Sequence, residues 1–332
     1  MPDFTGTVQE HPRSRRDTYL GTAAIAVSVY SALDFGRLVA LNRHVGPLLS
    51  LGGAAIILIL LGALIKAFGF AWAGAGFLGY GSARASRFRR AGYILAGGCG
   101  LVFLGDALAY LISPYYYGYP FGGWELALGV AVTAYHGLAA VAALLVARSF
   151  GRARRWHSRN AMLGWAAVVL GGGSALLLFW DIGSLKFGLS NIGLWEPVYQ
   201  THTLEAGWSV SWLVALAVAA VGFFSASRVS RSLPDNRPTR RAGFLMVAAV
   251  ALVVASALGM AQFLIMLRYN WDSVAIPEAR DLSRFAFCLL GVLENGALLV
   301  GSLLAFFGFA AERKLALPNE QVAPLAVESA RK

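Results

Sequence analysis

The sequence predicts an all-α protein, a bundle of helices that crosses a lipid bilayer about eight times. Of its 332 residues, 58% are hydrophobic and only 14% are charged, whereas a soluble domain carries about 25% charged residues. The chain therefore has too few polar side chains to cover a globule in water, and lipid must cover much of it. The formal charge is +11, but the basic residues stand in short clusters between apolar runs. This placement favours a membrane protein over nucleic-acid binding.

The apolar runs set the number of spans. A spanning helix needs about 20 mostly apolar residues, because each residue rises 1.5 Å and the hydrocarbon core is about 30 Å thick. The first run is longer than the apolar core of a signal peptide, so we expect it to be retained. Residues 68–80 continue the second run, and we expect them to extend the helix or to lie at the interface. Eight runs meet the length requirement: 18–38, 47–67, 91–113, 124–147, 161–181, 204–226, 242–267 and 285–310.

The basic residues predict the orientation. One set of ends and connections holds 21 of the 28 basic residues, and basic connections stay in the cytoplasm. We therefore expect both termini to be cytoplasmic, and a composition rich in Arg, Ala and Gly favours a bacterial inner membrane. The predicted divisions are a cytoplasmic tail (1–17), a first four-helix half (18–148), a basic linker (149–160), a second half (161–311) and a cytoplasmic tail (312–332).

A faint duplication relates the two halves. The basic-Ala-Gly-aromatic segment 89–93 opens the third span, and a similar segment, 240–244, opens the seventh. Asp34 and Asp181 close the first and fifth spans, and His44 and His202 precede the second and sixth. Each match pairs a helix with the one four places later. This spacing predicts two four-helix halves in the same orientation, as in transporters built from parallel repeats.

Ionisable residues inside the spans indicate the site, because a charge in hydrocarbon costs about 3 kcal/mol or more. Asp106 lies in the outer third of the third span, His136 near the middle of the fourth, and Glu294 in the eighth, about 14 Å below the outer end by helical rise. Gln262 lies on the same face of the seventh span as Gly259 and Ser256. We expect Asp106, His136, Glu294 and Gln262 to line one polar site that opens to the outside.

Other polar residues receive simpler interpretations. Asp34, Asp181 and Glu205 are near the outer ends, where we expect solvated caps, and Lys66 is the one ionisable residue in the inner half of a span. Ser174 follows three glycines, which indicates close helix packing. Cys99 and Cys288 have no CxxC or histidine neighbours, so we expect packing and no metal site.

The histidines favour a second hypothesis. His44, His136 and His202 stand at or in the second, fourth and sixth spans of a duplicated eight-helix pattern. This layout resembles that of haem A synthase-like proteins and some respiratory cytochrome subunits, although the eighth span has no histidine. The resemblance implies haem bound by histidines of even-numbered spans. On this alternative the chain is a haem-binding or redox membrane protein.

The sequence thus predicts an integral membrane protein that transports a small solute or ion. In one version of this hypothesis, transport is coupled to protonation of the site. No cofactor is expected unless the haem alternative holds. Another alternative is a non-catalytic subunit of a larger membrane complex, since glycine-rich faces on the third and fifth spans suit helix association. The sequence has no GxxxxGK[ST] or HExxH motif, and it leaves open whether the protein is an enzyme.

Overall fold

The computed structural model describes residues 14–42, 51–79, 81–117, 123–151, 156–190, 196–227, 237–274 and 279–316. Within them the regular elements are eight helices, and each contains a stretch long and apolar enough to cross a membrane. The predicted eight-span bundle is therefore confirmed. The helices are α1 (Arg15–Asn42), α2 (Leu51–Phe77), α3 (Gly81–Tyr117), α4 (Gly123–Ser149), α5 (Trp156–Ser190), α6 (Glu196–Ser227), α7 (Arg237–Val274) and α8 (Ala279–Ala316).

Most helices continue past the predicted spans. Helix α2 runs unbroken to Phe77, so the apolar segment after residue 67 extends the helix. Helix α8 continues to Ala316, and Glu312, which the sequence placed in the C-terminal tail, is a buried residue of its last turns.

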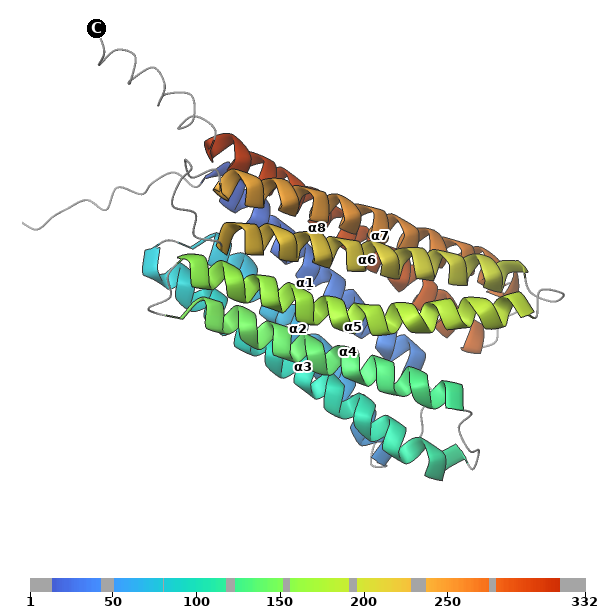
Figure 1. Cartoon of the computed structure of the whole chain (residues 1–332). Helices are drawn as coiled ribbons and strands as arrows, with labels where there is room; N and C mark the ends of the chain where they lie inside the picture. Colours follow the sequence, from blue (N-terminus) through green and yellow to red (C-terminus); the bar gives the residue numbers. More distant parts are fainter. Residues whose placement is uncertain are drawn as a thin grey trace, which may run out of the picture.

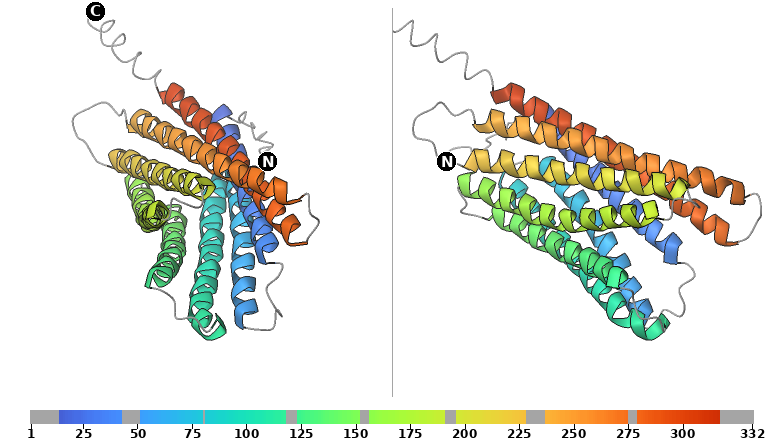
Figure 2. Two further views of the ribbon diagram at one scale, coloured as in Figure 1. Left: turned by 90° about the vertical axis from the view of Figure 1, so that its right-hand side faces the viewer. Right: turned by 45° about the vertical axis from the view of Figure 1, so that its right-hand side comes forward.

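The eight helices form a closed ring. Each helix packs against the helices before and after it in sequence, and α1 also packs against α8 (Figure 1). Among the described residues, no other two of these helices approach within 8 Å between Cα atoms. The left view of Figure 2 shows α4 and α5 on one side of the molecule, with α1 and α2 on the other. Side chains that bridge non-neighbouring helices must therefore reach across or along the inside of the ring.

Small residues hold the helices together, while large apolar side chains face outward. Alanine dominates the buried apolar residues, whereas Phe68, Trp165 and Phe179 are exposed, Phe179 by 71%. Lipid is as apolar as these side chains, so burying them between helices would gain little, and close backbone packing drives association instead. A Cβ atom on Gly62 of α2 would lie 2.6 Å from the carbonyl oxygen of Gly98 in α3.

The glycines before Ser174 behave partly as predicted. A Cβ on Gly173 would lie 3.3 Å from Cα of Tyr135, so α4 and α5 do approach closely there. Gly172 has open space around it. Ser174 donates a hydrogen bond to the carbonyl of Leu170 in its own helix, at 3.2 Å.

The proposed duplication stays a prediction. Asp34 and Asp181 each contact a side chain of the following helix, Lys66 in α2 and Ser209 in α6. Asp181 is buried and accepts a hydrogen bond from Ser209, so it is not the solvated cap that its position suggested. A donor on the neighbouring helix satisfies this carboxylate inside the bundle. His44 lies outside the described residues, and the side chain of His202, in α6, is not described either.

Candidate functional site

Four charged side chains alternate in sign across three helices inside the spans. Nζ of Lys66 in α2 lies 4.0 Å from Oδ2 of Asp34 in α1. The other carboxylate oxygen of Asp34 accepts a hydrogen bond from Nη2 of Arg37, at 2.9 Å. Nε of Arg37 lies 2.9 Å from Oε2 of Glu294 in α8. We call Lys66, Asp34, Arg37 and Glu294 the four-charge cluster; its formal charges sum to zero.

Local sequence explains why these side chains meet. Asp34 and Arg37 are three residues apart, so they share one face of α1. Gly36 between them faces α8, since a Cβ at this position would lie in van der Waals contact with Leu290, at 3.6 Å. Glu294 follows Leu290 by four residues and therefore faces α1 as well. Side chains lean toward the N-terminus of their helix, which directs Lys66 along α2 toward Asp34.

Aromatic rings enclose the guanidinium of Arg37. Its Cζ atom lies 5.4 Å from the ring centre of Phe263 in α7 and 5.4 Å from that of Phe287 in α8. A cation over an aromatic face is attracted by the ring quadrupole, more strongly where water is excluded. The side chain of Arg37 remains 25% exposed, whereas that of Glu294 is only 3% exposed. Arg37 is thus held by two carboxylates and two aromatic faces.

The Arg37–Glu294 contact is an ion pair without an aligned hydrogen bond. The two atoms are close, but neither Nε of Arg37 nor Oε2 of Glu294 has a partner in hydrogen-bonding geometry. The carboxylate of Glu294 also accepts a hydrogen bond from Tyr30 in α1. One buried carboxylate oxygen therefore retains unused hydrogen-bonding capacity toward a cation.

A second ionisable pair joins α3 and α4. Nδ1 of His136 lies 2.6 Å from Oδ2 of Asp106, and Asp106 is buried. When Nδ1 carries the hydrogen, it donates to the carboxylate and leaves Nε2 as the free nitrogen of the ring. The pair can therefore hold and transfer a proton, or present Nε2 to a ligand.

Two tyrosines, Tyr30 of α1 and Tyr135 of α4, interact with residues of the four-charge cluster. Tyr30 is in electrostatic range of Glu294, Asp34 and Tyr135. Tyr135, the residue before His136, is in range of Asp34. The structure thus brings Asp106 and His136 into direct contact, whereas Glu294 belongs to the four-charge cluster. That they form one site with Glu294 stays a prediction.

The other sequence candidates have less defined surroundings. Gln262 is partly buried in α7 and precedes Phe263, whose ring packs on Arg37. His44 and the side chain of His202 are not among the described parts of the chain. Among the described residues, no group of three or more His, Cys, Asp or Glu side chains could hold a metal ion.

Sequence reasoning missed the role of Arg37. No role was predicted for Arg37, although the residue lies within the first predicted span, 18–38, and within the apolar stretch Arg15–Ala40. The three-residue spacing from Asp34 was a signal of an ion pair on one helix face. The partner on α8 carries no such signal, because sequence separation gives no information on which helices adjoin.

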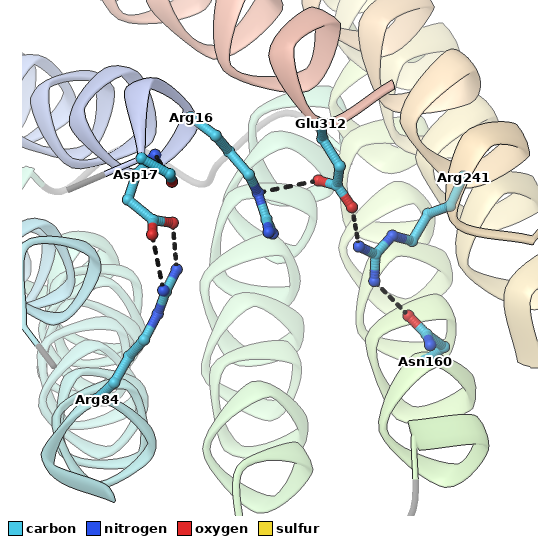
Figure 3. A network of polar contacts seen from close by, with 7 residues as sticks. Arg16, Asp17, Arg84, Asn160, Arg241 and Glu312 are labelled. Carbon is cyan, nitrogen blue, oxygen red and sulfur yellow. Dashed lines mark hydrogen bonds and ion pairs between the residues drawn. The ribbon is translucent and has the colours of Figure 1, made fainter. Parts of the chain in front are cut away.

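A polar network ties the helices together at the other end of the bundle (Figure 3). Glu312 of α8 pairs with Nε of Arg16 in α1, at 3.3 Å, and with Arg241 of α7. Arg241 also donates to Oδ1 of Asn160 in α5, at 3.2 Å. We call Arg16, Asn160, Arg241 and Glu312 the end network. It links α5 to α7 past α6.

A further ion pair lies beside the end network. Arg84 of α3 donates to both carboxylate oxygens of Asp17 in α1, at 2.7 and 3.1 Å, and so links helices on either side of α2. The guanidinium of Arg241 additionally lies 4.8 Å from the ring centre of Trp156 in α5. These contacts show that the basic ends of five helices meet at one end of the ring.

The ring of apolar helices defines an integral, multi-pass membrane protein. Comparisons with protein-family models, with curated proteins and with solved structures find no match to this chain.

Proposed function

We propose that this protein transports a small solute or ion across the membrane, and that the four-charge cluster is the place where the cargo binds. The observation that carries this proposal is the alternation of Lys66, Asp34, Arg37 and Glu294 within the spanning segments of three helices. Ionisable residues within a membrane face the interior of the bundle and mark pathways for substrates and ions.

The cost of the cluster supports a functional role. Taking charges out of water costs several kcal/mol per ion, and apolar residues of similar volume often give equal or greater stability. Helix association here has another source, since small residues bring α2 and α3 into backbone contact at Gly62 and Gly98. The fold does not need four charges at this place, so their presence favours a cargo or a proton.

The Asp106–His136 pair supports coupling to protons. Histidine is the side chain that ordinarily changes charge near neutral pH, and Asp106 holds its Nδ1 at 2.6 Å. Tyr135, next to His136, is in electrostatic range of Asp34. Coupling requires that protonation of the pair alters the free energy of cargo binding at the cluster, and this link is part of the proposal.

The end network supports a sealed inner side. It binds helices from across the ring at the end that carries the basic termini and connections. As part of the proposal, this end of the bundle lies in the cytoplasm. We propose that the membrane is a bacterial inner membrane. Asp34, Arg37 and Glu294 of the cluster then belong to the outward-facing half of the pathway.

Reconstituted vesicles test the proposal. Currents or internal pH are recorded while small cations, anions and zwitterions are applied in turn. We expect a saturable response to one class and its loss in Glu294→Gln, because the amide keeps the shape and removes the charge. Asp181→Asn is the matched control, since it removes a buried carboxyl that contacts Ser209 away from the cluster. No response above empty vesicles, or an unaltered response in Glu294→Gln, contradicts the proposal.

The contact between Asp106 and His136 favours haem or redox chemistry as a second candidate. Histidines that ligate a metal commonly donate their other ring nitrogen to a carboxylate, which orients the ring. An absorption spectrum of the purified protein tests this candidate. A Soret band that His136→Ala weakens supports it, and a featureless visible spectrum after growth with added haem contradicts it.

A further inference from the structure

We infer that the cargo is a small organic cation of the guanidinium or ammonium class, and that the guanidinium of Arg37 occupies the cargo site when no cargo is bound. This inference rests on the proposed transport function and adds the chemical class of the substrate. It follows from the surroundings of one side chain, which together form a complete receptor for a planar cation.

The contacts of Arg37 come from three helices. Asp34 of α1 and Glu294 of α8 each place a carboxylate oxygen 2.9 Å from a guanidinium nitrogen. Phe263 of α7 and Phe287 of α8 each place a ring 5.4 Å from the guanidinium carbon. Carboxylates supply charge and aromatic faces supply cation–π attraction, the combination that recognises organic ammonium and guanidinium ligands.

The same surroundings disfavour a bare metal ion. Calcium and magnesium need about six or more oxygen ligands, and phenylalanine rings supply none. The cluster contributes two carboxylates, and one of them is already shared with Lys66. A weakly hydrated organic cation fits better, because aromatic faces can replace the water that it loses.

Charge balance predicts how Arg37 affects binding. The cluster is neutral with Lys66 and Arg37 opposite Asp34 and Glu294. An added cation must therefore displace the guanidinium of Arg37 from Glu294, and this competition weakens binding. The side chain is long and partly exposed, so it can withdraw. Without the guanidinium of Arg37, the cluster carries one net negative charge. The vacancy that remains has the shape of a guanidinium ion and is surrounded by its former partners.

The test titrates guanidinium chloride at millimolar concentration, far below denaturing levels, into the full-length purified protein. Thermal unfolding is followed by tryptophan fluorescence, with sodium chloride and urea as solute controls. We expect a saturable rise in the unfolding temperature of Arg37→Gln, with an affinity about ten-fold or more above that of the unmodified protein. Arg268→Gln removes an exposed arginine of α7 and should behave like the unmodified protein. Glu294→Gln added to Arg37→Gln should abolish the rise.

If Arg37→Gln cannot be purified alone, guanidinium is included during extraction. Recovery with guanidinium, but not with sodium or urea, supports the site; failure with all three overturns it, because the vacancy then accepts no free cation. Equal effects of guanidinium and sodium on Arg37→Gln also overturn it.

A transport measurement separates this inference from the function on which it rests. Vesicles with the unmodified protein should take up labelled guanidinium, and methylguanidinium should compete. Responses to an anion or a neutral solute, with no uptake of guanidinium, would leave the transport proposal standing and overturn the organic-cation inference. Absence of any transport would contradict the proposed function itself.

Discussion

Nε of Arg37 in α1 lies 2.9 Å from Oε2 of Glu294 in α8, inside the spanning segments of both helices. This pair joins α1 to α8, where the ring of helices closes. It unites Glu294, which the sequence selected as a site residue, with Arg37, for which the sequence predicted no role.

The first prediction concerns the two partners of this pair. Arg37→Gln should destabilise the protein more than Glu294→Gln. Loss of Arg37 leaves two carboxylates without their cation, whereas in Glu294→Gln the guanidinium of Arg37 still pairs with Asp34. Breaking a buried ion pair costs about 3–5 kcal/mol, and we expect Arg37→Gln in that range. The double variant should recover part of this loss. Thermal unfolding in detergent measures all three; additive effects would show that the pair contributes no coupling.

The second prediction concerns Asp106 and His136. Asp106→Asn and His136→Gln should each destabilise the protein, and the double variant should cost less than the sum, by about 1.5–3 kcal/mol for a charge-assisted bond. Ser174→Ala is the control, because the hydrogen bond described for its hydroxyl goes to a backbone carbonyl of its own helix and joins no second helix. A coupling near zero in the double-mutant cycle would mean that the short contact adds nothing to the fold.

The third prediction compares two adjacent arginines. Arg241 binds Glu312 and Asn160, whereas Arg240 is exposed. Arg241→Gln should loosen the end network and admit a membrane-impermeant thiol reagent to a cysteine placed at Ala242, a buried neighbour outside the network. Arg240→Gln removes the same charge and should leave labelling unchanged. Equal labelling in the two variants would show that the network does not seal this end.

The fourth prediction concerns helix packing. Gly62→Ala should destabilise the bundle by about 1–3 kcal/mol through overpacking, because the added Cβ would lie 2.6 Å from both the carbonyl of Gly98 and Cγ2 of Val102. Gly97→Ala adds the same methyl group where no atom of a neighbouring helix lies within 4 Å. It should be neutral or stabilising. The unfolding temperatures of the two variants decide the matter, and a tolerated Gly62→Ala would contradict the close approach of α2 and α3.

The fifth prediction concerns orientation. Reporter fusions after Arg155 and Arg237 should report the cytoplasm, and fusions near Tyr117, Trp195 and Trp271 should report the outside. The reason is the excess of basic residues on one side of the chain. A cytoplasmic signal at Tyr117 would reverse or break the eight-span order.

The sequence predicted the helices well because the bilayer imposes a local rule. Every backbone polar group in hydrocarbon must be bonded within its own segment, so a run of about 20 apolar residues is sufficient to predict a span. The sequence also indicated the depth of polar residues in the membrane. Asp106 and Glu294 were selected by counting residues from the ends of their apolar runs, and both are buried. Asp181 was misjudged because burial at a helix end depends on a neighbour such as Ser209.

By itself, then, the sequence determined the eight spans, the polar residues within them and the end of the bundle that carries the basic clusters, since each follows from properties of a contiguous segment. Only the tertiary structure decided which polar residues pair. Closure of the ring between α1 and α8 brings Arg37 to Glu294, and the approach of α7 adds the ring of Phe263. Such contacts join residues more than 200 positions apart, and hydropathy and spacing carry no information about them, because lipid makes every apolar helix face nearly equivalent until small residues and side-chain shapes select its neighbours.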